Sequence, residues 1–402
     1  MTVPLPPTVR LDHADPLLAE FTARVLAHTA HRERPAVVLD QSAFYPESGG
    51  QHADRGTLAE AAVVDVQVDE RAVVHHVVQG ARPAVGTEVT GRLDPVRRRR
   101  HMALHTGQHM LSQALLDVAG AATVSSHLSQ AGCTLDVDVP ALSPEQLRAA
   151  EDAVNAVVDR DVAVRTWFPS DAELATLVLR RPPKVDTHVR VVAVGDYDRV
   201  ACGGTHCTHT SQVGWLLCLS AERYKGMTRV HFLAGPAARE RARTRLDALD
   251  RLGAEFTCRP DLVPRAVQKL KREHDALGAE LHALRERVAA GIAERLLTEA
   301  DPEDGLVVAT LRDPSCTLDL LRSVGQRVVA EPGRAAALAA PLADGLAIFV
   351  ARGTGPPLHC GDLVRRICTA AGGRGGGRAD HAEGRLPAGA DWPALVRAHV
   401  RR

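Results

Sequence analysis

The sequence predicts a multidomain α+β protein that begins with a small β-barrel and ends with an α/β domain. At 402 residues the chain is too long for one hydrophobic core, and 45% apolar with 24% charged residues is typical of globular domains. The apolar pattern also changes along the chain. We expect a barrel over residues 1–95, a two-layer α+β domain over 96–235, a helical linker over 236–300 and the α/β domain over 301–402.

The first region has the pattern of short strands separated by turns. Apolar residues alternate in Ala36–Leu39, Val63–Val68, Val73–Val78 and Thr87–Leu93, which favours a small barrel or a curled sheet. The segment Phe44-Tyr-Pro-Glu-Ser-Gly-Gly-Gln51 is expected to be a loop, with two aromatic residues followed by a glycine pair. On composition alone, this loop could also be a plain turn between strands.

The second region mixes helices and strands. A helix is expected over His101–Val118, and Ser143-Pro-Glu-Gln146 has the N-cap, N1 proline and N3 amide of a second helix that runs to about Asp159. Val189–Val194 and Val213–Leu219 have the composition of buried strands. The loop between these strands should therefore be held by a rigid scaffold, as functional loops often are.

Two short blocks in this region predict a zinc site. In His105-Thr-Gly-Gln-His109, a spacing of four residues on a helix places both imidazoles on one face. In Cys202-Gly-Gly-Thr-His206, the glycines allow a tight turn that brings a thiol and an imidazole together. Each block alone is a weak signal, but together they supply four nitrogen and sulfur donors of the kind that zinc prefers.

The cysteines argue for a reducing compartment. All eight are dispersed, and the first 132 residues contain none, so a disulfide framework is not expected. The N-terminus lacks a basic and then apolar signal pattern, and we expect a cytoplasmic protein. Cys207 and His209 lie close enough to the second block to compete as metal ligands, although Cys207 is expected to be a core thiol.

The linker region carries an apolar seam at alternating spacings of three and four residues. This spacing predicts a coiled coil or a helical hairpin, and the alternative is an amphipathic helix packed on a neighbouring domain. A homodimer could form through this helix or through the C-terminal domain. The seam consists of Val267, Leu270, His274, Leu277, Leu281, Leu284 and Val288.

The last region returns to strands and helices. Strands are expected at Leu306–Thr310 and Leu346–Ala351, and helices at 318–330 and 362–371. The glycine run 372–378 that follows matches neither a phosphate-binding P-loop nor a dinucleotide fingerprint. It is expected to be either a flexible contact for phosphate or RNA, or a plain surface loop.

These motifs together resemble a known family. The two zinc blocks and Phe44-Tyr-Pro-x-x-Gly-Gly-Gln51-x-x-Asp54-x-Gly56 are similar to the editing domain of alanyl-tRNA synthetase and to its free-standing relatives, the AlaX proteins. The glycine run with Arg378-Ala-Asp380 resembles the DHHA1 domain that follows in the synthetase and in the long AlaX form. The resemblance covers nearly the whole chain, and the long AlaX form is the better match.

The resemblance implies a hydrolase that removes a wrong amino acid, serine or glycine, from alanine tRNA. It implies that zinc is the cofactor, that the acceptor end of alanine tRNA is the partner, and that Ser42 and Gln51 form the pocket around the ester. The implied zinc ligands are His105, His109, Cys202 and His206. The candidate tRNA contacts are Arg97, Arg98, Arg100, Arg374 and Arg378.

Several alternatives stay open at this point. The zinc could activate a water molecule, orient the substrate, or be purely structural, because four protein ligands fill a tetrahedral ion. The chain could be a tRNA-binding module, or an enzyme that uses aminoacyl-tRNA in a biosynthetic or self-resistance pathway. Threonyl-tRNA synthetase editing domains use similar motifs. Glu383 also stands where the DHHA1 pattern has glutamine, which adds negative charge near an expected RNA contact.

Overall fold

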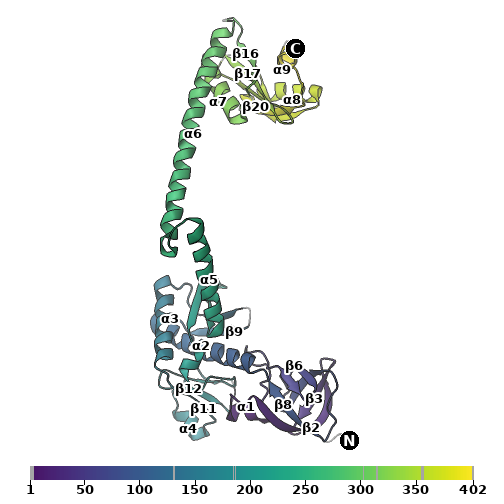
Figure 1. Ribbon diagram of the computed structural model, residues 1–402, viewed down its shortest axis with the longest axis vertical. Coiled ribbons are helices and arrows are strands. Elements are labelled where there is room, and N and C mark those ends of the chain that lie inside the picture. The colour runs from purple at the N-terminus through teal and green to yellow at the C-terminus, as the bar shows by residue number, and fades with distance from the viewer. Residues whose placement is uncertain are drawn as a thin grey trace. The chain divides into compact units, whose positions relative to one another are not determined.

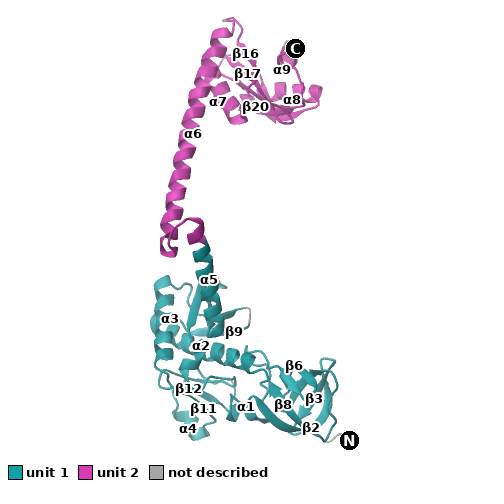
Figure 2. Cartoon of the chain, in the orientation of Figure 1, with its two compact units in different colours: residues 1–251 teal, residues 252–402 magenta. Residues whose placement is uncertain are grey.

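The computed structural model describes residues 4–129, 132–183, 185, 187–301, 303–313, 316–354 and 357–400. These residues form two compact units, 1–251 and 252–402, which Figure 2 shows in different colours. The regions expected to be a barrel domain and an α+β domain both lie in the first unit. Within the described part of the chain, no helix has the length and apolar character needed to cross a membrane.

The N-terminal barrel is confirmed. Six antiparallel strands close in the order β2-β3-β7-β6-β5-β8 (Figure 1). Side chains from alternate positions, such as Val25, Leu39 and Leu58, fill its interior together with Phe44 from the following loop. The strands are β2 (Glu20–His31), β3 (Arg34–Leu39), β5 (Gly56–Leu58), β6 (Ala61–Val68), β7 (Val74–Gln79) and β8 (Glu88–Leu93). The short elements β1 (Val9–Arg10) and α1 (Leu11–Ala14) precede β2, and β4 (Gln41–Ser42) follows β3.

The rest of the first unit is built around one buried helix, α2 (Pro95–Ala119). Asp94 caps its first turn, Pro95 occupies N1, and Gly120 ends it in the left-handed conformation. The helix packs with a four-stranded sheet of order β14-β15-β10-β9 and with α3 (Pro144–Asp159), whose predicted capping box is present. These strands are β9 (Thr123–Leu128), β10 (Cys133–Val137), β14 (Leu216–Tyr224) and β15 (Met227–Ala234).

A second, three-stranded sheet lies beside this core. Its order is β11-β12-β13, and all four residues of the central strand β12 are buried. Its strands are β11 (Val164–Trp167), β12 (Val191–Val194) and β13 (Asp198–Ala201), and the short helices nearby in sequence are α4 (Asp171–Thr176) and the 3-10 turn Thr210–Val213. The loop that leaves β13 carries the second of the two blocks.

The linker is helical, as the pattern predicted. It consists of α5 (Pro236–Glu255), a 3-10 turn at Pro260–Leu262 and the long helix α6 (Val263–Glu299). The end of α6 is anchored, since Ala289 and Ala293 pack into the core of the second unit. The apolar seam before them is uncovered within the chain: the exposures of its apolar residues run from 47% at Val267 to 65% at Leu277.

The second unit has a five-stranded sheet of order β16-β17-β18-β20-β19 that is covered on both faces. Alternate residues of one strand show this, because Ala336 and Leu338 belong to one core and Ala337 and Ala339 to the other. The strands are β16 (Leu306–Thr310), β17 (Ala335–Leu342), β18 (Gly345–Arg352), β19 (Arg374–Gly377) and β20 (His381–Leu386). The helices are α7 (Leu318–Val329), α8 (Cys360–Ala371) and α9 (Trp392–Val400).

The glycine run is a strand, which corrects the expectation of a flexible loop. β19 pairs with β20 along its whole length, and it contacts α8 as well. A Cβ on Gly377 would lie 2.5 Å from the Cα of Ala382, and one on Gly375 would lie 2.6 Å from the carbonyl oxygen of Glu383. The glycines therefore allow backbones to pack closely, which explains the composition without flexibility.

Candidate metal centre

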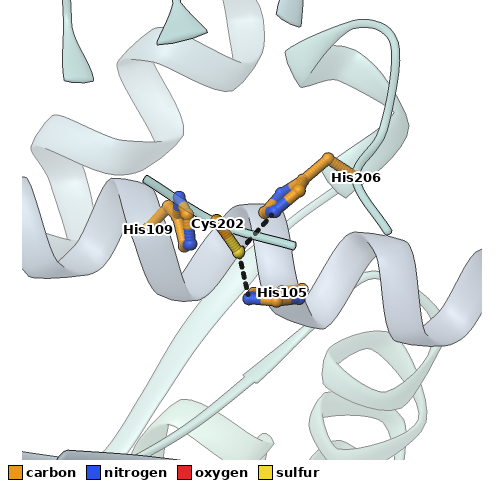
Figure 3. Close-up of side chains that lie close together, drawn as sticks. All are labelled: His105, His109, Cys202 and His206. Atoms are coloured by element: carbon orange, nitrogen blue, oxygen red, sulfur yellow. Dashed lines mark hydrogen bonds between the residues drawn. The ribbon is translucent and has the colours of Figure 1, made fainter. Parts of the chain in front are cut away.

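Four side chains converge in the first unit to form the predicted cluster. The ligand atoms of His105, His109, Cys202 and His206 all lie within 4.8 Å of one another (Figure 3). The Cys202 Sγ is 3.4 Å from the Nε2 of His105 and 3.3 Å from the Nε2 of His206. Two segments nearly a hundred residues apart thus contribute two donors each, as their spacing predicted.

Helix α2 supplies the two histidines of the first block. His105 and His109 are one turn apart, and their ring centroids lie 5.0 Å from each other. The helix is buried along this stretch, with 5% exposure at His105 and 3% at His109. Gly107, between them, faces the sheet and the 3-10 turn, where a Cβ would lie 3.3 Å from the side chains of Val213 and Ala234. A side chain at this position would have to displace these neighbours slightly.

The loop after β13 supplies the thiol and the third imidazole. Arg190, which is 5% exposed, holds this loop by donating from Nη1 to the carbonyl oxygens of Cys202 (3.1 Å) and Gly204 (2.7 Å). A Cβ on Gly204 would lie 2.1 Å from the Cε1 of His105. The second glycine of the block is therefore required by the close approach of the loop to an imidazole ring.

Each imidazole is oriented by a contact on the side away from the thiol. His105 Nδ1 donates to the Oε1 of Gln51 at 2.7 Å, and His206 Nδ1 lies 3.2 Å from the Oγ1 of Thr106. His109 Nδ1 faces the buried carboxylate of Asp198 at 3.8 Å. A proton on each Nδ1 leaves the Nε2 lone pair free for a metal, which is the usual arrangement around metal-binding histidines.

The carboxylate behind His109 is itself held in place. Arg180 donates to both oxygens of Asp198, at 2.8 Å from Nε and 3.3 Å from Nη2. Both side chains are largely buried, with 7% and 1% exposure. An oriented carboxylate next to a ligand histidine is expected to strengthen the ligand, because it favours positive charge on the ring.

The protonation states suit a cation. Burial alone would raise the pKa of the Cys202 thiol. The combined effect of the neighbouring His105 and His206 imidazoles is larger, so the pKa of this thiol lies well below its usual range. Burial lowers the pKa of His109 and of His206 well below the ordinary value, and the neighbouring His105 adds to this effect. Neutral imidazoles beside a thiolate are the forms that bind metal.

This donor set fits zinc. Three imidazole nitrogens and one thiolate are a tetrahedral combination that this borderline-soft ion accepts. Such residues would be unusual as a core without an ion, since a buried thiolate and three polar rings are costly to desolvate. We therefore expect these four residues to hold one zinc ion.

The competing ligands are placed elsewhere. Burial raises the pKa of the Cys207 thiol to about 12, so it stays protonated, and its backbone N–H donates to the Oγ1 of Thr106. His209 is absent from the group of described residues that could hold a metal ion. Cys207 is thus a core thiol, in agreement with its expected role.

The two expected pocket residues have different surroundings from those predicted. Gln51 is fully buried and donates from Nε2 to the Oγ1 of Thr205 at 2.8 Å, besides accepting from His105. Ser42 is also fully buried, and its hydroxyl lies 2.7 Å from the Nε2 of His76 in the barrel. Their contact with an ester stays a prediction; in the structure Gln51 contacts His105, where it can position the ring, and Ser42 pairs with His76.

Arg98 is a structural residue, which corrects its expected role as a tRNA contact. Its guanidinium is 3% exposed and forms a buried ion pair with Asp54 at 2.5 Å. Nη1 also donates to the carbonyl oxygen of Pro16 at 2.7 Å, and the Asp54 carboxylate accepts from the backbone N–H of Tyr45. Arg98 therefore ties α2 to the loop of the barrel, and its burial keeps it from a phosphate at the surface.

The other arginines of the prediction lie closer to the surface. Arg97 and Arg100 are half-buried on the first turns of α2, whereas Arg374 and Arg378 are exposed at the two ends of β19. Glu383 on the neighbouring strand is neutralised by Arg322, which donates to both of its oxygens at 2.6 Å. The negative charge of Glu383, which stands where the DHHA1 pattern has glutamine, is thus balanced by an arginine of the same unit.

Sequence reasoning missed the residues that orient the site. Thr106 and Thr205 lie within the two zinc blocks and Asp198 lies four residues before Cys202, yet their role depends on contacts between segments far apart in the chain, such as Thr106 with His206. Arg190 lies outside every motif. The one signal in the sequence that could have indicated Thr106 and Thr205 is that each is adjacent to a predicted metal ligand.

Comparisons with known proteins agree with the motifs. The family model described as tRNA synthetases class II (A) matches residues 17–97. The model of the threonyl and alanyl tRNA synthetase second additional domain matches residues 189–231, which include the Cys202 block. The first match covers the barrel, and the second covers the loop half of the cluster.

Curated relatives match almost the whole chain. The alanine–tRNA ligase of Halorubrum lacusprofundi is 33% identical over 401 residues, covering 95% of this chain and 42% of the ligase. That of Pyrococcus abyssi is 32% identical, with the same coverages, and that of Frankia casuarinae is 36% identical, covering 94% of this chain and 44% of the ligase. This chain thus spans less than half the length of these relatives.

Solved structures align over parts of the chain. The C-Ala domain of Aquifex aeolicus alanyl-tRNA synthetase covers 23% of it and 85% of that domain, with a TM-score of 0.22 and 19% identity. RecJ from Thermus thermophilus covers 36% of this chain and 20% of its own, with a TM-score of 0.25 and 22% identity. These similarities are too low to support an argument.

The barrel, the cluster and the matched models define a protein that carries the threonyl and alanyl tRNA synthetase second additional domain. Within that class the chain belongs to the alanyl-tRNA synthetase-related family, as the motifs predicted.

Proposed function

We propose that this protein is a long-form AlaX trans-editing enzyme, which hydrolyses the ester between serine or glycine and alanine tRNA. The observation that carries the proposal is the cluster of His105, His109, Cys202 and His206, a buried set of metal donors whose loop half lies inside the matched second additional domain. The relatives over 95% of the chain are alanine–tRNA ligases, which favours alanine tRNA over threonine tRNA.

The chemistry needs little activation, because an aminoacyl ester is already labile. Zinc, when bound, would supply a Lewis acid that orients or polarises the ester. The residues of this chain set the geometry: Gln51 fixes the His105 ring, Asp198 faces His109, and Gly204 lets the loop approach. Positioning is therefore the main contribution that we assign to the protein.

A tRNA-binding module with a structural zinc is the competing function. The observation in its favour is the set of four protein ligands, because catalytic zinc sites normally keep one position open. An enzyme of a biosynthetic or self-resistance pathway that consumes aminoacyl-tRNA would share the same site. The three possibilities differ in the product that forms from a charged tRNA.

Deacylation assays test the proposal. The zinc-loaded protein is incubated with serine and glycine on alanine tRNA and with serine on threonine tRNA. Free amino acid should be released from the alanine tRNAs, and Cys202→Ala should abolish release while Cys258→Ala, a half-buried cysteine of the second unit, should not. The absence of hydrolysis by the wild-type protein, with tRNA still bound, would support the module instead.

A further inference from the structure

A cavity of about 450 Å³ lies on the first unit, near the start of α2. Its walls come from the barrel, from the Phe44–Gln51 loop and the segment after it, from the residue after β9, and from the first turn of α2. The charged residues that line it are Arg34, Glu47, His52, Arg55, Asp65 and Arg97.

Both carboxylates of the cavity already have partners within it. Asp65 forms an ion pair with Arg34, and Glu47 lies 3.1 Å from the Nδ1 of His52. Neither Arg55 nor Arg97 forms an ion pair among the described residues, although the charges of Glu47, Asp54 and Asp94 act on Arg97 from a distance.

The two remaining arginines have free hydrogen-bonding capacity. Arg97 donates from Nε to the carbonyl oxygen of Ala53 at 3.0 Å, which fixes the guanidinium and leaves both terminal nitrogens without a partner among the described residues. The side chain of Arg55 has no hydrogen bond or ion pair in the described part of the chain. Burial and the nearby Arg55 lower the pKa of Arg97, and the carboxylates of Asp54, Asp94 and Glu47 only partly oppose this effect. Adjacent guanidinium groups of this kind suit the oxygens of a phosphate.

A buried histidine lies on α2 between the arginine of this cavity and the metal-binding cluster. Arg97, His101 and His105 follow one another at spacings of four residues along α2, so each faces the next. His101 is fully buried, and neither of its ring nitrogens has a hydrogen-bond partner in the described structure. Its ring centroid lies 6.5 Å from that of His52, which lines the cavity.

The spacing along the helix suits a polymer that enters from the cavity. Eight residues of α-helix separate Arg97 from His105, which corresponds to about 12 Å along the axis. This distance is within reach of a short single-stranded RNA end. An RNA whose terminal ester lies at His105 and whose chain runs parallel to α2 would place a backbone phosphate near Arg97, without contact to the fully buried His101.

We propose that this cavity is a phosphate-binding subsite for the single-stranded 3′ end of an RNA, with Arg55 and Arg97 as the ligands of one backbone phosphate. The inference rests on the proposed function, because the ester is taken to lie at the metal-binding cluster. It adds a residue of the barrel, Arg55, that no sequence motif indicated.

Two double variants with the same change in charge test the subsite. Arg55→Gln with Arg97→Gln removes the two ligands, and Arg24→Gln with Arg82→Gln removes two exposed arginines elsewhere on the barrel. Binding of a fluorescently labelled single-stranded RNA that ends in CCA is measured by anisotropy across a salt series. The cavity variant should bind at least tenfold more weakly and should reduce the salt slope by about 0.7 for the lost phosphate contact.

The control variant and a kinetic measurement distinguish failure of the subsite from failure of the proposed function. The control variant should keep the wild-type affinity and slope. If hydrolysis occurs, the ratio of kcat/KM for seryl-tRNA to kcat/KM for 3′-seryl-adenosine, which has no phosphate, should fall at least tenfold in the cavity variant alone. Equal affinities in the wild-type protein and the cavity variant, equal losses in both variants, or no binding of the RNA at low salt would overturn the subsite. RNA binding that depends on the cavity without any hydrolysis would overturn only the deacylase function.

Discussion

Gln51 and His105 form a 2.7 Å hydrogen bond that joins the loop of the barrel to the metal-binding cluster. The amide oxygen accepts from Nδ1, which fixes the tautomer that leaves Nε2 for a metal. Because the Gln51 amide also contacts Thr205 through Nε2, it joins both halves of the cluster. Gln51, which the sequence predicts to line the pocket, therefore also supports the cluster.

Replacing Gln51 should weaken metal binding. We expect Gln51→Ala to lower the affinity for zinc by about 10–100-fold, the usual effect of removing a group that orients a ligand. Competition with a chelator of known affinity measures this change. Gln113→Ala is the control, because that half-buried glutamine of the same helix donates its side-chain hydrogen bond to Asp117 and is absent from the cluster. Equal affinity in the Gln51 variant and the wild-type protein would contradict the positioning role.

The two glycines of the Cys202 block should differ sharply in their tolerance of a methyl group. A Cβ on Gly204 would lie 2.1 Å from the Cε1 of His105, whereas one on Gly203 would meet nothing within 4 Å. Gly204→Ala should therefore lose most of the roughly one zinc per chain that we expect, and Gly203→Ala should retain it. Elemental analysis of the purified proteins provides the measurement. Full zinc content in Gly204→Ala would show that the loop can move away.

The fully buried His76 should make the free energy of unfolding depend on pH. Burial lowers its pKa to about 4, while a histidine in an unfolded chain titrates near 6.5. Between these values the unfolded state binds a proton that the folded state does not. The free energy of unfolding should therefore decrease as pH falls, by up to about 1.4 kcal/mol per pH unit from this residue.

A comparison of variants isolates this contribution. His76→Gln should show a shallower loss of stability between pH 6.5 and 5 in urea titrations, whereas His28→Gln, at an accessible position of β2, should keep the wild-type slope. Identical slopes in all three proteins would mean that the ring is protonated in the folded state or that another group dominates the titration.

The fold was predictable where apolar spacing and chain breakers agreed. The alternation at Val63–Val68 and the capping box at Ser143 correspond to β6 and the start of α3. β17 was missed because its residues from Ala335 to Ala340 are mostly alanines, which have little preference for strands. Only its position between two layers of helices explains why small apolar residues form a strand there.

The cluster was predictable because its two halves are local motifs with spacings that suit one ion. Its environment was not, because the partners of a buried side chain depend on which segments meet. Nothing near Arg98 in the sequence distinguishes it from Arg97, yet the first is enclosed with Asp54 and the second lines a cavity. A run of arginines thus predicted positive charge without showing which of its members face solvent.

The apolar seam of α6 should pair with a second copy of this chain. Leu277 and Leu281 are 65% and 48% exposed, and such a long uncovered stripe is unusual for an isolated helix. Leu277→Glu with Leu281→Glu should convert a dimer to the mass of one chain, because paired helices would bury unpaired charges. Ala279→Glu with Ala283→Glu adds the same charge away from the seam and should preserve the dimer. Light scattering measures each mass, and a wild-type protein that already has the mass of one chain would exclude pairing of the seam between copies.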